Sequence, residues 1–153
     1  MRREELITQG ALYFERIEQG MEEYEWQSIC APAQKAGLLL EENWKKNSGK
    51  AFLDFYYFSL EDANRKKLQT ALSEEEIQWL QEKERELKKN PAFEPEKDLF
   101  FPLEERLLKI AVRLNETEML FSTFYFTGEK STWWGNYGKE YVVFRERESG
   151  KRR

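Results

Sequence analysis

The residues from Glu118 to Glu146 constrain the fold more than any other stretch of this chain of 153 residues. Two runs rich in aromatic and β-branched residues, 119–127 and 140–146, flank a connection that is rich in Gly, Ser, Thr and Asn. Short β-prone runs on either side of a glycine-containing connection are typical of a β-hairpin. The sequence therefore predicts a C-terminal β-hairpin with a long loop.

The loop of this predicted hairpin carries three large aromatic residues, Trp133, Trp134 and Tyr137. Such rings either fold back over the sheet and complete the core, or remain exposed and bind another molecule, and the sequence leaves both possibilities open. If the loop is a binding site, its polar contacts would come from Lys130, Asn136 and Lys139.

A further predicted strand covers residues 51–58, whose sequence AFLDFYYF places apolar groups on both faces. Asp54 interrupts this pattern. Burial among apolar side chains would raise the pKa of its carboxyl group, which is a common property of functional sites. Alternatively, Asp54 points to solvent, or bonds to a Tyr hydroxyl or a backbone N–H. Asp54 is therefore a candidate acid, base or ligand-binding residue.

Helical spacing of apolar residues predicts helices over 3–18, 33–46, 60–71, 73–89 and 102–114. Residues 21–31 fit either a helix or a strand, and we predict a helix that ends before Pro32. Residues 90–101 contain two prolines and are predicted to form a loop. Together these segments indicate an α+β fold, with about five helices packed on a small, mainly antiparallel sheet. We expect residues 1–147 to form one globular domain, and 148–153 to form a charged, frayed tail.

Composition excludes several classes of chemistry. With no histidine, the chain has no Ser-His-Asp triad and no imidazole metal ligand. Its single cysteine, Cys30, cannot form an intrachain disulfide, which suits the reducing cytoplasm, and we expect it to be a small buried hydrophobic residue. A general base would have to be Asp, Glu, Lys or Tyr. The sequence predicts no metal and no cofactor.

The acidic net charge of −4 argues against nucleic acid and anionic membranes as partners. We expect no membrane association, because no apolar run approaches the length of a membrane span.

Three hypotheses for the function follow from these observations. The first is a cytoplasmic, non-enzymatic protein-binding module, such as an inhibitor, adaptor or immunity-type protein, that uses the aromatic loop. The second is a small-ligand-binding domain or a carboxylate-based enzyme with a pocket near Asp54. The third is a single-stranded nucleic-acid binder that stacks bases on the loop aromatics.

Overall fold

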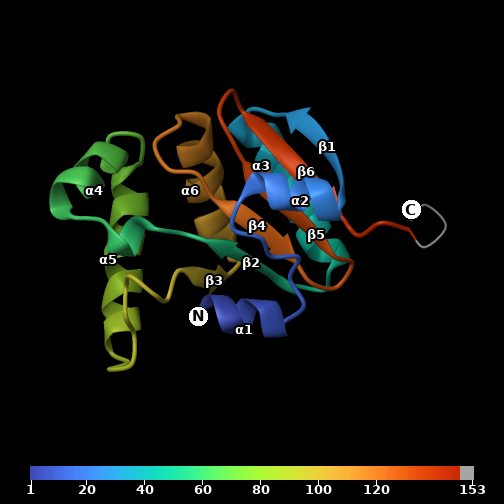
Figure 1. Ribbon diagram of the computed structural model, residues 1–153. Helices are drawn as coiled ribbons and strands as arrows, with labels where there is room; N and C mark the ends of the chain where they lie inside the picture. Colours follow the sequence, from blue (N-terminus) through green and yellow to red (C-terminus); the bar gives the residue numbers. More distant parts are fainter. Residues whose placement is uncertain (149–153) are drawn as a thin grey trace.

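The computed structural model describes residues 1–148 and shows a six-stranded antiparallel sheet with helices on both faces (Figure 1). The strand order is β1-β6-β5-β4-β2-β3. The strands are β1 Glu25–Cys30, β2 Ala51–Asp54, β3 Phe100–Pro102, β4 Thr123–Phe126, β5 Ser131–Gly135 and β6 Glu140–Arg145. The α-helices are α1 Arg3–Thr8, α2 Ile17–Glu23, α3 Ala33–Lys46, α4 Asp62–Gln69, α5 Glu74–Lys88 and α6 Glu105–Glu116. This confirms the predicted α+β fold.

The main core lies between the sheet and helices α3 and α6. Leu40 from α3 and Ile110 from α6 are fully buried there against Phe124 of β4 and Val143 of β6. Each such side chain contributes about 1.5–3 kcal/mol to stability when it is removed from water. Helices α4 and α5 lie together at one side of the molecule (left in Figure 1) and add Leu80 to the same core.

The N-terminal segment covers the opposite face of the sheet. Leu6 of α1 packs with Phe100 and Tyr125, and Phe14 packs with Phe144 next to α2. The connection between these two helices is tied to the sheet, because the Thr132 hydroxyl donates a hydrogen bond to the carbonyl of Leu12 at 2.7 Å. The N-terminal segment thus forms an incomplete second layer, and this layer leaves part of the sheet uncovered.

The C-terminal prediction of a single hairpin was wrong in its connectivity. The predicted loop contains a strand of its own, β5, which pairs with β4 on one side and β6 on the other. Residues 119–127 and 140–146 therefore belong to a three-stranded meander and do not pair with each other. The physical reason is that Ser131–Trp134 are themselves β-prone and take up the ladder hydrogen bonds of both neighbours. The turn at Gly138, with φ +68°, then connects β5 to β6.

Three further boundaries differ from the predictions. The predicted helix 3–18 is broken, because the chain turns at Gly10 with φ +98° after α1 ends. The helical prediction for 21–31 was wrong beyond Glu23, since residues 25–30 form β1 along the edge of β6. The predicted strand 51–58 ends at Asp54, where a short 3-10 helix, Tyr57–Ser59, follows.

Other segments agree with the sequence or extend it. The predicted helices over 33–46 and 73–89 are confirmed as α3 and α5. Within the predicted loop 90–101, the last two residues begin the short strand β3. Cys30 was predicted to be buried but is exposed on β1.

The predicted frayed tail covers residues 148–153. Residues 149–153 of this tail lie outside the described residues. Within residues 1–148, no helix has both the length and the apolar character needed to cross a bilayer.

Candidate functional site

A pocket of about 400 Å³ opens on the sheet face that the N-terminal segment covers incompletely. Its lining comes from the ends of β2, β4 and β5, from Phe100 on β3 and from the connection between α1 and α2. Segments that are far apart in the chain therefore converge on one hollow. Its volume lies within the range of small-molecule sites in proteins. We refer to it as the Asp54 pocket.

Asp54, the last residue of β2, lines this pocket. Asp54 is only 8% exposed to solvent. One carboxyl oxygen, Oδ1, accepts a hydrogen bond from the Thr123 backbone N–H at 2.7 Å, and the Tyr56 hydroxyl bonds to the same carboxyl group. Burial raises the pKa of Asp54 from 3.8 to about 7, although these two hydrogen bonds oppose the rise. The carboxyl group therefore exchanges its proton near neutral pH.

Three tyrosines surround this carboxyl group. Burial raises the pKa of Tyr56 and Tyr125 above the usual phenol range, and the charge of Asp54 adds to both shifts. The pKa of Tyr13 is also raised, first by burial and then by Glu15. All three phenols are consequently neutral at pH 7 and can donate hydrogen bonds within the pocket.

The walls of the pocket are aromatic and rigidly packed. The rings of Tyr13, Phe100 and Tyr125 contact one another with centroid separations of 6.0–6.2 Å. Phe14 stacks on Trp134 with a centroid distance of 5.5 Å and an angle of 7° between the planes. Five of the seven aromatic residues of the lining therefore pack against another ring of the lining.

Gly20 is required for that arrangement. A Cβ at this position would lie 2.5 Å from the ring of Phe14 and 2.8 Å from the ring of Phe144. Only glycine lets α2 approach the sheet closely enough to hold Phe14 against Trp134. Thus α2 positions one wall of the pocket although no α2 residue lines it.

The predicted site residues separate into two groups. Asp54, Trp134 and Asn136 line the pocket together. Trp133 points to the other face of the sheet and is only 6% exposed in the core, where its indole N–H donates to Ser131 Oγ at 3.2 Å. The structure thus supports the interpretation in which this ring completes the core.

The remaining loop residues lie outside the pocket. Lys130 belongs to the turn between β4 and β5, where its side chain lies beside Gly10. Lys139, in the turn between β5 and β6, accepts a hydrogen bond on its carbonyl from the Ala31 N–H at 2.9 Å. Tyr137 is 68% exposed, and its ring packs edge to face on Phe121 at 4.8 Å. Because Trp133 is buried, a base-stacking surface on this loop could not include its ring.

Sequence reasoning missed most of the aromatic lining, including Tyr13, Tyr56 and Tyr125. One signal was available for β4. Thr123 and Tyr125 alternate with Phe124 and Phe126, so a strand places the first pair on one face and the second pair on the other. The first pair lines the pocket and the second lies in the main core. Tyr13 carried no such signal, because its position depends on how the N-terminal segment folds back.

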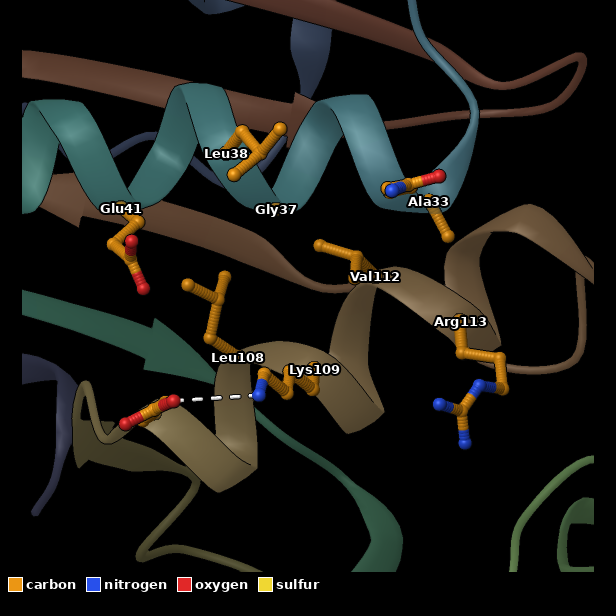
Figure 2. Close-up of a pocket in the computed structure, with 10 residues that line it drawn as sticks. Ala33, Gly37, Leu38, Glu41, Leu108, Lys109, Val112 and Arg113 are labelled. Atoms are coloured by element: carbon orange, nitrogen blue, oxygen red, sulfur yellow. Dashed lines mark ion pairs between the residues drawn. The ribbon is translucent and has the colours of Figure 1, made fainter.

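A second hollow, of about 300 Å³, lies between α3 and α6. Figure 2 shows Leu108 and Val112 projecting from α6 towards α3 near Gly37, with Arg113 directed away. Its charged neighbours are already paired: Lys109 with Glu105, Arg113 with Glu76 and Glu41 with Lys45. A ligand in this groove would contact mainly aliphatic side chains. A ligand in the Asp54 pocket would contact apolar side chains and also a buried ionisable group.

No family model matches this chain, and neither the curated proteins nor the solved structures include a match. A buried carboxyl group that titrates near neutrality, neutral phenols and preformed aromatic walls can bind a small organic molecule and hold a polar group of that molecule against Asp54.

Proposed function

We propose that this protein is a small-molecule-binding domain whose ligand occupies the Asp54 pocket. The observation that carries the proposal is a buried carboxyl group in the lining of an aromatic hollow to which, among residues 1–148, no lysine or arginine contributes. Keeping a carboxyl group in such a place opposes folding, because its ionised form loses solvation. A ligand that bonds to Asp54 would offset this cost.

Protein-observed NMR with a library of small organic fragments tests the proposal. Binding should shift the backbone amides of Thr123, Gly135 and Asn136, which border the pocket. Hits that perturb only residues of the α3–α6 groove would place the site elsewhere, and the absence of hits would refute the proposal.

Two matched substitutions locate the binding site. Thr123→Met extends a side chain into the Asp54 pocket but keeps the backbone N–H that bonds to the carboxyl group. Ala33→Met extends the same side chain into the groove between α3 and α6. Fragment binding should be lost in the first variant and retained in the second. The reverse pattern would contradict the assignment.

A protein-binding role is the second candidate, and the exposure of Tyr137 favours it. The ring is held in place by Phe121, and the turn that carries it is braced by a hydrogen bond from the Gly138 N–H to Glu118 at 2.8 Å. Tyrosines that are exposed and preordered are favoured at the centres of protein interfaces. We propose the cytoplasm as the compartment for either role, because Cys30 is a free and exposed thiol.

Native mass spectrometry of the protein purified from its host tests this second role. A stoichiometric protein partner should be lost after Tyr137→Ala and retained after Trp26→Ala, which removes a different exposed aromatic residue. Equal retention in both variants would exclude Tyr137 as the anchor.

A further inference from the structure

The charged side chains that line the Asp54 pocket are acidic. Asp54 and Glu15 line it, and among residues 1–148 no lysine or arginine does so. Glu15 is exposed and pairs with Arg3 at 2.6 Å. The described hydrogen-bond partners of Asp54 are neutral, namely the Thr123 N–H and the Tyr56 hydroxyl. A ligand in this pocket therefore meets a negative potential, to which Asp54 contributes when it is ionised.

The aromatic content of the lining points to the same type of ligand. Seven of its twelve residues are Phe, Tyr or Trp. The faces of aromatic rings carry partial negative charge and attract organic cations, with strengths of about 0.5–2 kcal/mol for each well-placed ring. Aromatic rings around a carboxylate are a chemical environment suited to an ammonium group.

We propose that the Asp54 pocket recognises a small organic ammonium ion, with Asp54 as its counter-ion and the aromatic walls around its apolar body. This inference rests on the proposed small-molecule function and specifies the charge of the ligand. An anionic ligand would be repelled by the ionised carboxylate, because among residues 1–148 no cationic side chain lines the pocket to compensate. A neutral alcohol would gain no charge–charge attraction to Asp54.

The proposal implies that binding depends on pH. The groups that face Asp54 are the Thr123 N–H and Tyr125 from β4, Tyr56 after β2, and Tyr13 from the N-terminal connection. The phenols remain neutral through pH 8, and the lining also includes Glu15, which pairs with Arg3. Asp54 is the buried carboxyl group of the lining, and its pKa of about 7 lies within the pH range to be tested.

Binding of a cation requires the ionised carboxylate. Because the pKa of free Asp54 is about 7, affinity should fall about tenfold for each pH unit below 7 and be roughly 100-fold weaker at about pH 5 than at about pH 8. This dependence distinguishes an ammonium ligand from a neutral molecule that contacts the same aromatic rings.

Three probes with the same phenyl body test the inference: phenethylammonium, phenethyl alcohol and phenylpropionate. Dissociation constants are measured by protein-observed NMR at about pH 5 and about pH 8. At about pH 8 the cation should bind at least about tenfold more tightly than the alcohol, and the anion should bind most weakly. The advantage of the cation over the alcohol should disappear at about pH 5.

Two variants locate the effect. Asp54→Asn keeps a carbonyl oxygen for the Thr123 N–H and should remove both the preference for the cation and the dependence on pH. Glu105→Gln removes an exposed carboxylate on α6 and should change neither. If Asp54→Asn does not fold, the pH dependence of the wild-type protein still decides the question.

The failures of the two proposals are distinguishable. Equal or tighter binding of the alcohol or the anion in the pocket at about pH 8 would overturn the ammonium inference and leave a small-molecule function in place. Affinity of the cation that does not change with pH would overturn it as well. Absence of binding by all three probes, together with an empty fragment screen, would overturn both.

Discussion

Replacement of Asp54 by Asn should stabilise the protein at neutral pH and remove part of its pH dependence. The pKa of Asp54 in the folded protein is about 7, against an ordinary value of 3.8. The two values differ by about three pH units, and each unit corresponds to about 1.4 kcal/mol. The ionised carboxyl group therefore lowers the free energy of unfolding by about 4 kcal/mol once the pH exceeds 7.

The sign follows from proton binding. Between pH 3.8 and about 7 the unfolded chain has released the Asp54 proton and the folded protein still holds it. The folded state then binds more protons, so stability falls as the pH rises through this window. The contribution is fully present below pH 3.8 and is lost by the time the pH passes about 7. Asparagine does not titrate, and its amide oxygen can still accept the Thr123 N–H.

Urea denaturation of the wild-type protein and Asp54→Asn, monitored by tryptophan fluorescence, measures this effect. The difference in unfolding free energy between the two proteins should favour the variant increasingly as the pH rises from about 4.5 to about 8, by up to about 4 kcal/mol. Titration of all other carboxyl groups cancels in the difference. A difference that stays constant over this range would refute the assignment of a raised pKa to Asp54.

Three substitutions at other positions test the packing. Gly135→Ala would place a Cβ 2.7 Å from the backbone carbonyl oxygen of Ser122, so chemical denaturation should show a loss of about 1–3 kcal/mol, and unchanged stability would contradict this contact. In contrast, a Cβ at Gly37 of α3 would meet only Val112 of α6, at an ordinary van der Waals distance of 3.9 Å. Gly37→Ala should therefore stabilise the protein by about 0.5–1 kcal/mol and raise its midpoint of thermal unfolding. Arg65→Ala breaks a bidentate ion pair with Glu84, whose two hydrogen bonds are 2.8 and 2.7 Å long. Urea denaturation should show that the free energy of unfolding falls by about 3 kcal/mol. A fall of less than about 0.5 kcal/mol would show that solvent replaces the pair.

Local sequence patterns determined the elements that depend on neighbours along the chain. Helix α5 begins where Ser73 and Glu76 form a reciprocal capping box, and the two residues are three positions apart in the sequence. The apolar residues of α6 likewise recur at helical spacing, so the sequence predicts which face of this helix is buried. The burial of Asp54 and its hydrogen bonds to a tyrosine hydroxyl and a backbone N–H were both among the alternatives that its apolar neighbours suggested.

Other elements depended on partners far away in the chain. Strand β1 could be read as a helix or a strand, and pairing with β6, more than a hundred residues later, decided the outcome. The glycines around β5 indicate turns and therefore predict a loop. In the structure, β5 lies between β4 and β6, and its backbone groups form ladder hydrogen bonds with both strands.

Patterns along the chain were sufficient to predict the α+β class, the positions of the long helices and a carboxyl group in apolar surroundings. That Asp54 faces a pocket depends on how distant segments pack together. That pocket exists because Tyr13, Tyr56, Phe100 and Tyr125 arrive from four separate segments of the chain and leave space between them. Periodicity along the chain encodes which face of an element is apolar, but the space between elements depends on how they pack against one another.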